Sequence, residues 1–241
     1  MISVRQTAIA IALAVTTAVS AQAQLPTVQQ VFDKYATAMG GRDAWAKVTD
    51  RAELGSADIA FANIKGSYER YYAAPNKFRL IINLGADIGK VEQGSDGVLV
   101  WAAQPGADAA KMPADDAAYV LEMSVTGAAF LDPSRFAKSS VAALEDFDGV
   151  SCYKVLLTSK SGRDRIDYFE VATGLRRGQV LKLPIGDQKT TYRDYKVFDG
   201  KKAPTSIVQS NAQGDIVITL TTVSFTQNDP KLFTLPAGMG K

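Results

Sequence analysis

Residues 66–106 read GSYERYYAAPNKFRLIINLGADIGKVEQGSDGVLVWAAQPG, and this stretch decides the fold. Its short apolar runs are separated by turn signals at Pro75-Asn76, at residues 85–89 and at Ser95-Asp96-Gly97. Gly97 can take the positive φ that a tight hairpin turn needs. The order of strand, turn, strand, turn and strand predicts an antiparallel meander rather than alternating strands and helices.

The middle run of this stretch, residues 77–84, alternates between apolar and polar side chains. That period of two is typical of a half-buried strand. The apolar face holds Phe78, Leu80, Ile82 and Leu84, and the opposite face holds Lys77, Arg79 and Asn83, with Ile81 as the exception. Trp101 falls in the middle of the strand predicted after the Asp96-Gly97 turn, just before the break at residues 104–106.

The first 23 residues have the pattern of a secretory signal peptide. Arg5 supplies a charged start, residues 8–15 (AIAIALAV) form an apolar run too short to span a bilayer, and residues 21–23 (AQA) form a cleavage site. Residue 24 is Gln rather than the Cys that lipid attachment requires, so we expect an unanchored, soluble protein that starts there. We expect residues 24–241 to form a single domain, since all-β domains often reach roughly 200–250 residues.

The chain contains no histidine, and this absence removes whole classes of chemistry. Histidine-dependent triads and dyads, and nearly all transition-metal sites, need this residue. A formal net charge of +2 argues against a nucleic acid as the main partner. No phosphate-binding loop, dinucleotide glycine fingerprint or G-x-S-x-G motif is present. We therefore expect no enzyme activity, no cofactor and no metal, although chemistry based on carboxylates or on a Ser-Lys pair stays open.

Two carboxylate clusters and one cysteine are the remaining candidates for chemistry. We interpret Asp115-Asp116 and residues 145–148 (EDFD) as solvated loop charge, or as helix N-terminal charge for the first cluster, rather than as catalytic or calcium sites. Cys152 is the only cysteine, so no internal disulfide can form. It lies in a strand-like run, which indicates a buried, unreactive thiol.

Outside the central stretch, the pattern predicts helices near both sides of it and strands to the end. Thr27 and Gln30 form a capping box before a helix that Gly40-Gly41 ends, and a short turn follows at residues 42–47 with Trp45. Residues 115–130 indicate an apolar helix that Asp115 or Asp116 could cap, with Gly127 as a break. Strands are predicted at residues 51–64, with a kink or bulge at Gly55, and at 150–159, 165–171, 175–183, 190–198, 205–209 and 216–225.

The order of these motifs resembles the LolA-like outer-membrane lipoprotein-sorting proteins over roughly residues 27–236. The resemblance rests on Gly66, Tyr68, Pro75 and Phe78, on Asp96-Gly97 with Trp101 and Pro105, on Met39-Gly40-Gly41 with Ala44-Trp45, on Asp194-Tyr195 with Gly200 and Pro204, and on Phe233 with Pro236. It implies a mainly β fold, a half-open antiparallel β-barrel with helices covering the concave face, in the Gram-negative periplasm. It also implies a hydrophobic cavity for a lipid or a lipoprotein acyl chain, and an arginine that locks the lid, for which Arg51 and Arg70 are candidates.

From this resemblance we expect a monomeric carrier that exchanges lipid or acylated lipoprotein cargo with donor and acceptor proteins of the inner and outer membranes. The alternative is a periplasmic sensor, resembling RseB-like proteins, that detects lipids or mislocalised lipoproteins. The residues expected to line the cavity are Tyr68, Tyr72, Phe78, Leu80, Ile82, Leu84 and Trp101. The same apolar face could instead be filled core under the first helix, because a cavity and a core demand the same residue types.

Overall fold

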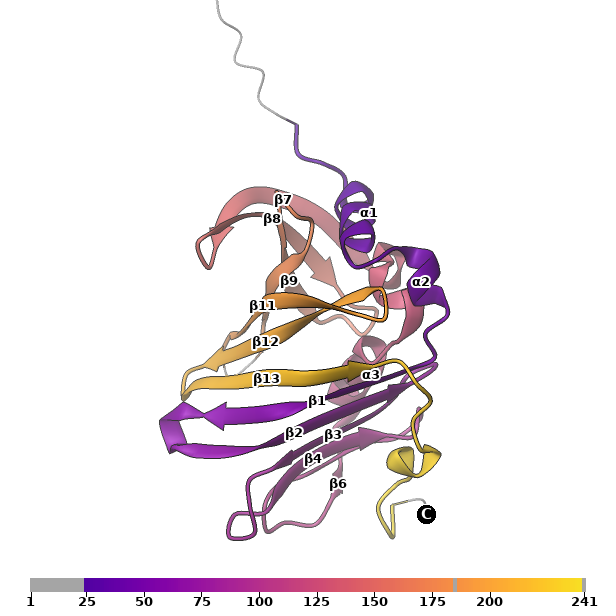
Figure 1. The fold of residues 1–241 in the computed structure, drawn as a ribbon, viewed down its shortest axis with the longest axis vertical. Helices are drawn as coiled ribbons and strands as arrows, with labels where there is room; N and C mark the ends of the chain where they lie inside the picture. Colours follow the sequence, from indigo (N-terminus) through magenta and orange to yellow (C-terminus); the bar gives the residue numbers. More distant parts are fainter. Residues whose placement is uncertain (1–23, 184–185, 240–241) are drawn as a thin grey trace, which may run out of the picture.

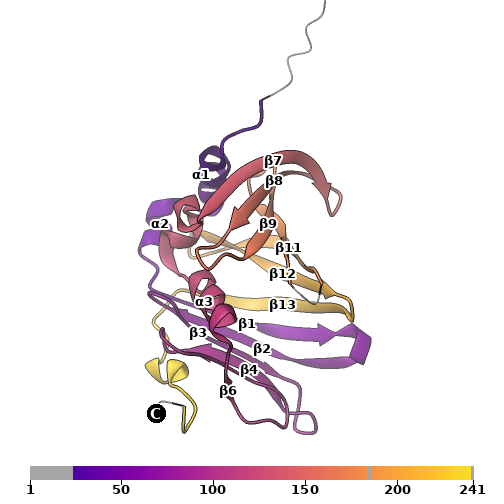
Figure 2. The same cartoon turned by 180° about the vertical axis from the view of Figure 1, so that it is seen from behind.

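The computed structural model describes residues 24–183 and 186–239, and these residues form one antiparallel sheet of 13 strands (Figure 1). The sheet curls around one face without closing, so the prediction of a mainly β, half-open barrel is confirmed (Figure 2). The predicted signal peptide, residues 1–23, lies outside the described residues. Within the described ranges, no helix is both long enough and apolar enough to cross a membrane.

The strand order follows the sequence except at one junction. Strands β6 to β1 form one meander and β13 to β7 form a second, and the two meet where β1 pairs with β13. The helices are α1 (Val28–Ala38), α2 (Arg42–Ala46) and α3 (Ala114–Met123), with the 3-10 helices η1 (Ala60–Ala62), η2 (Gly127–Leu131), η3 (Pro133–Arg135) and η4 (Pro230–Phe233). The strands are β1 (Asp50–Ile59), β2 (Ile64–Ala73), β3 (Lys77–Asn83), β4 (Lys90–Ser95), β5 (Val100–Ala103), β6 (Ala110–Lys111), β7 (Lys138–Phe147), β8 (Val150–Thr158), β9 (Asp164–Glu170), β10 (Arg176–Leu181), β11 (Gln188–Phe198), β12 (Lys201–Asn211) and β13 (Gly214–Ser224).

The predicted meander of residues 66–106 forms β2 to β5. The Asp96 carboxylate accepts hydrogen bonds from the backbone N–H groups of Val98 and Leu99, each at 2.9 Å, and Gly97 has a φ of 100°. Phe78 is buried on the concave face, whereas the neighbouring Arg79 points to the opposite face, where it pairs with Glu92. The period of two in β3 therefore sets which side chains can reach the inside of the half-barrel.

The predicted kink at Gly55 is a bulge in the pairing of β1 with β13. The register shifts between Leu54 and Gly55. A Cβ atom at residue 55 would lie 2.0 Å from the carbonyl oxygen of Thr219, so only glycine allows the two backbones to approach this closely.

The first helix begins at the predicted capping box. The backbone N–H of Gln30 donates to Thr27 Oγ1 at 3.2 Å, and the backbone N–H of Thr27 donates to Gln30 Oε1 at 2.8 Å. The buried face of α1 packs against β8, β9 and the segment 127–136. The centres of the Phe32 and Phe169 rings lie 5.2 Å apart. This aromatic core holds α1 at one end of the half-barrel (Figure 1).

The predicted helix over residues 115–130 is too long. Helix α3 ends at Met123, because Ser124 leaves the helical region and the chain continues as the 3-10 helices η2 and η3. Asp115 and Asp116 lie in the first turn, and the N-cap position is Pro113, so neither carboxylate caps the helix. Residues 124–126 are irregular chain before η2, and apolar periodicity alone does not distinguish such an interruption from a continuous helix.

Strand β7 is absent from the sequence-based expectations. The sequence pattern at residues 145–148 predicts solvated loop charge, but Glu145 and Asp146 are exposed on the strand itself. Asp148 sits in the turn after the strand, at a φ of 55°. A solvent-facing edge strand can carry these charges, because its outer face needs no apolar residues.

Candidate ligand-binding cavity

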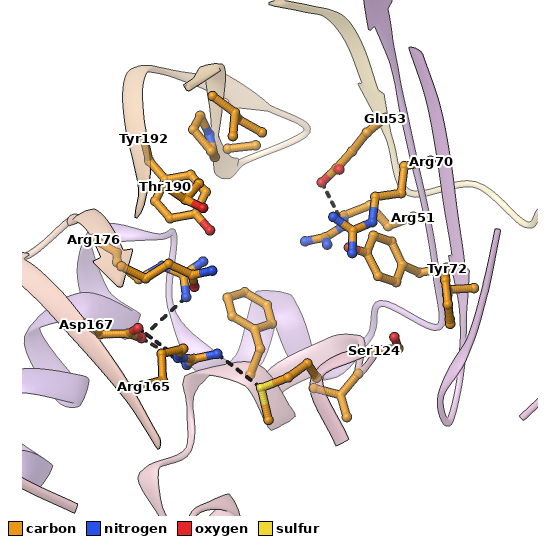
Figure 3. A pocket seen from close by; sticks show the side chains of 18 of the residues that line it. Arg51, Glu53, Arg70, Tyr72, Ser124, Arg165, Asp167, Arg176, Thr190 and Tyr192 are labelled. Carbon is orange, nitrogen blue, oxygen red and sulfur yellow. Dashed lines mark hydrogen bonds and ion pairs between the residues drawn. The ribbon is translucent and has the colours of Figure 1, made fainter. Parts of the chain in front are cut away.

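A cavity of about 310 Å³ lies between the concave face of the sheet and α3 (Figure 3). Figure 2 shows α3 crossing this face in front of the first meander. Helix α3 is called the lid helix below. It packs through Val120 and Leu121 against the buried cluster of Tyr72, Phe78 and Val100.

The first polar wall of the cavity comes from β1 and β2. Glu53 pairs with Arg70 and Arg51 pairs with Tyr72 in the register of the two strands, so all these side chains share the concave face. Arg51 Nε lies 3.2 Å from the Glu53 carboxylate. The guanidinium carbons of Arg51 and Arg70 lie 4.4 Å and 4.9 Å from the centre of the Tyr72 ring, so both cations interact with this one ring.

The second polar wall comes from β9 and β10, on the other meander. Arg165 and Asp167 alternate along β9, and Arg165 Nη2 donates to Asp167 at 3.0 Å. Arg176 donates to the same carboxylate at 3.4 Å, and its guanidinium carbon lies 4.5 Å from the centre of the Tyr192 ring. Figure 3 shows the Arg176 side chain pointing across the cavity toward Arg51 and Arg70.

The lid helix is tied to the second meander by arginines. Arg135 donates a hydrogen bond to the carbonyl oxygen of Glu122, in the last turn of the helix. Arg163 forms an ion pair with Asp116 at 2.6 Å, and its guanidinium carbon lies 4.8 Å from the centre of the Tyr119 ring. Arg135, a cation at the C-terminal end of this helix, also interacts favourably with the helix dipole. The lid helix thus contacts both meanders and closes the gap between them.

The electrostatic environment of the cavity is positive. Burial, and then the neighbouring cations Arg165 and Arg176, lower the pKa of Arg135 to about 10. Burial raises the pKa of Tyr72, against the opposing effect of Arg70 and Arg51. Its hydroxyl is therefore neutral at physiological pH and can donate a hydrogen bond.

The other end of the cavity is aromatic. The centres of the Trp45 and Phe130 rings lie 4.7 Å apart, and the centres of the Tyr35 and Phe169 rings lie 5.2 Å apart. All of these side chains line the cavity. The cavity therefore combines a cationic region between the two walls with aromatic side chains of α1, α2, η2 and β9, an arrangement that suits a molecule with a polar head and an apolar tail.

The structure brings together some of the predicted cavity residues and separates others. Tyr68, Tyr72 and Phe78 lie on the cavity wall. Leu80 and Ile82 share their face of the sheet but pack against the neighbouring cluster around Ala57, Tyr68 and Ile218, and Leu84 also lies outside the lining. Trp101 is buried on the opposite face of the sheet, where the guanidinium carbon of Arg79 lies 4.3 Å from its ring centre. Trp101 lies on the same face of the sheet as Arg79, because both residues lie opposite Gly94 in the register of neighbouring strands.

The sequence interpretation named only Arg51 and Arg70 among the cavity arginines, as candidates for locking the lid, and missed Arg135, Arg165 and Arg176. Arg51 and Arg70 do line the cavity, but the arginines that donate hydrogen bonds to the lid helix are Arg135, Arg163 and Arg165. One signal was available: Arg165 and Asp167 alternate with Ile166 and Tyr168, which is unusual for a strand with two buried faces.

Solved structures with a similar fold include a LolA superfamily protein, a lipoprotein-sorting protein domain and a DUF1329 family protein. A LolA superfamily protein from Nitrosomonas europaea is 13% identical, with a TM-score of 0.58 over 88% of this chain and 99% of that one. An outer membrane lipoprotein-sorting protein domain from Vibrio parahaemolyticus is 10% identical, with a TM-score of 0.59 over 85% of this chain and 95% of that one. A DUF1329 family protein from Desulfovibrio piger is 14% identical, with a TM-score of 0.57 over 82% of this chain and 92% of that one.

No protein-family model and no curated protein matches the chain. The likeness to the solved structures establishes the fold: this chain has the half-open barrel of LolA-like proteins. At these identities the likeness establishes no ligand and no activity.

Proposed function

We propose that this protein is a periplasmic carrier that binds a lipid or a lipoprotein acyl chain in the cavity and transfers it toward the outer membrane. The observation that carries the proposal is the cavity of about 310 Å³ between the concave face and the lid helix. Support for the location comes from the predicted signal peptide and from the likeness to an outer membrane lipoprotein-sorting domain.

Burial of the acyl chain alone can provide the binding free energy of such a carrier. An acyl chain of about sixteen methylenes contributes about 13 kcal/mol on leaving water, at roughly 0.8 kcal/mol for each methylene. The cavity lies at the lower end of ligand-sized pockets, which span roughly 300–1,000 Å³. The closed form therefore suits one slender chain, and a cargo with two or three chains requires the lid helix to move.

Native mass spectrometry of protein purified from the periplasm tests this proposal. We expect a bound species whose mass is that of a lipid or an acylated peptide. The matched variants are Val120→Glu and Ala118→Glu, because Val120 lines the cavity whereas Ala118 is exposed on the same helix. Val120→Glu should lose the bound species and Ala118→Glu should keep it. A lipid-free wild-type protein that also fails to bind added lipid would contradict the proposal.

A further inference from the structure

We propose that the ligand is an anionic amphiphile, whose acidic headgroup lies between the arginines of the two cavity walls and whose chain occupies the aromatic end. This inference rests on the proposed carrier function and names the chemical class of its ligand. The headgroup is a carboxylate or a phosphate, since both accept hydrogen bonds from a guanidinium group in the same way.

The first argument is the charge of the cavity. Of the described residues that line it, five are arginines (Arg51, Arg70, Arg135, Arg165 and Arg176), whereas the carboxylates are only Glu53 and Asp167. Uncompensated charge at a buried site is costly, because the group has left water. A bound anion would supply the missing negative charge. An acyl chain attached only through neutral ester or amide groups would leave the excess positive charge unmatched.

The second argument is that hydrogen-bonding capacity on both walls is unused. The Nε atoms of Arg70 and Arg176 are buried and have no hydrogen-bond partner among the described residues. Although Glu53 lies opposite Arg70 in the strand register, its carboxylate forms its ion pair with Arg51, and the Arg176 contact to Asp167 is long, at 3.4 Å. Arg70 and Arg176 belong to opposite walls and face each other across the cavity (Figure 3). A headgroup placed between them could accept hydrogen bonds from both.

The third argument is the separation of polar and apolar surface. The arginines of the two walls lie on β1, β2, β9 and β10, whereas Phe32, Trp45 and Phe130 form the end beneath α1 and η2. A free inorganic anion would bury no apolar surface against the aromatic side chains, and a neutral hydrocarbon would accept no hydrogen bonds from the arginines. A molecule with both parts fits both regions.

Calorimetric titration of the delipidated protein with four twelve-carbon probes tests the inference. The probes are dodecanoate, monododecyl phosphate, dodecyl maltoside and dodecyltrimethylammonium, each used below its micelle concentration. We expect at least one anionic probe to bind about tenfold or more tightly than the neutral and cationic probes, as charge-assisted hydrogen bonds would provide. The tighter of dodecanoate and monododecyl phosphate identifies the headgroup as carboxylate or phosphate.

Three variants assign the preference to the cavity. Arg70→Gln and Arg176→Gln should each weaken the anionic probe about tenfold and leave dodecyl maltoside almost unchanged. Arg79→Gln removes the same charge from the opposite face of the sheet and should bind all probes as the wild type does. If a cavity variant fails to fold, raising sodium chloride from about 50 mM to about 500 mM with the wild type should weaken only the anionic probe.

The outcomes separate the two proposals. If none of the probes binds, the carrier function itself fails. If all probes bind with similar affinity, the carrier function stands and the anionic headgroup is wrong. The inference is also overturned if the anionic probe is preferred but neither Arg70→Gln, Arg176→Gln nor added salt weakens it.

Discussion

Arg165 donates a hydrogen bond to the Sδ atom of Met123 at 3.0 Å, which joins β9 to the last residue of the lid helix. The same guanidinium group also bonds to Asp167 on the cavity wall. One side chain therefore links the lid helix with the cationic wall that faces the ligand space. A ligand that competes for Arg165 would also disturb the end of the lid helix, so binding and lid movement should be coupled.

The ion pair between Arg163 and Asp116 should limit opening of the lid helix. Its side chains are 21% and 42% exposed, so Arg163→Ala should cost less than about 1 kcal/mol of global stability. We expect faster hydrogen exchange in residues 114–123, measured by mass spectrometry, because local opening needs only local contacts to break. Lys154→Ala, which breaks the ion pair of Lys154 with Glu145 on the second meander, is the control. Equal exchange of the lid helix in both variants would show that this ion pair does not hold it.

Two truncations distinguish filled core from the margin of the cavity. Phe32 is buried in the aromatic core beneath α1, so Phe32→Ala should lower the free energy of unfolding by about 3–5 kcal/mol. Leu80 is only partly buried, against the neighbouring cluster around Tyr68 and Ile218, so Leu80→Ala should cost less than about 2 kcal/mol. Urea unfolding measures both values. Equal losses would mean that Leu80 is packed as tightly as Phe32.

The thiol of Cys152 should be unreactive in the folded protein. Its side chain is buried, and burial, followed by the charge of Glu170, raises its pKa to about 12. The reactive thiolate is therefore scarce at pH 8. A chromogenic disulfide reagent should label it slowly in buffer and rapidly in concentrated urea. Rapid labelling of the native protein would show that β8 opens readily.

The Asp148 turn should make stability depend on pH in the acid range. Hydrogen bonding to Arg193, together with Arg177, lowers the pKa of Asp148 from the ordinary value of 3.8. A depressed carboxyl pKa stabilises the fold above that ordinary value, and the stability is lost as pH falls through the folded-state pKa. Asp148→Asn should cost about 1 kcal/mol at pH 6, and less at pH 3, in urea unfolding. Asparagine tolerates the positive φ at this position, so a loss that is equal at both pH values would exclude the charge as its cause.

Removing a cavity cation should stabilise the empty protein. Because the pKa of Arg135 is lowered, its protonated side chain destabilises the fold at every pH below about 10. Arg135→Met should therefore raise Tm, by roughly 2–4 °C for each kcal/mol recovered, even though one hydrogen bond to Glu122 is lost. Arg193→Met is the opposite control, because hydrogen bonding to Asp148 raises the pKa of Arg193, and its loss should lower Tm. A lower Tm for both variants would mean that the cavity charge is compensated within the fold.

The sequence predicted the parts of this structure that depend on local chemistry. The alternation around Phe78 assigned the two faces of β3, Gly55 marked the bulge, and Thr27 with Gln30 marked the start of α1. These features follow from backbone geometry and neighbouring side chains, which a linear pattern contains. The sequence did not predict the end of the lid helix or the edge strand β7. The residues after Met123 stay apolar although the helix has ended, and the charged residues of β7 hide the alternation of apolar and polar side chains that marks a strand.

The cavity was only partly predictable for a different reason. Arg70 and Arg176 are far apart in the sequence. They face each other across the cavity because the sheet curves between their strands. Strand patterns identify the face of each residue but not the curvature, and curvature decides which faces oppose each other. Trp101 illustrates the same limit, because its face depended on the register of β5 against β4.

The single junction between β1 and β13 has a consequence for the order of folding. Every other strand pairs with a neighbour in the sequence, whereas this junction joins Ala52 to Ser224. Contacts across long loops carry a larger closure entropy and form later than hairpins. We therefore expect the two meanders to assemble separately, with the docking of β13 on β1 as a late step. The arginines of the two walls would then stay in water, apart from each other, until nearly all of the sheet has formed.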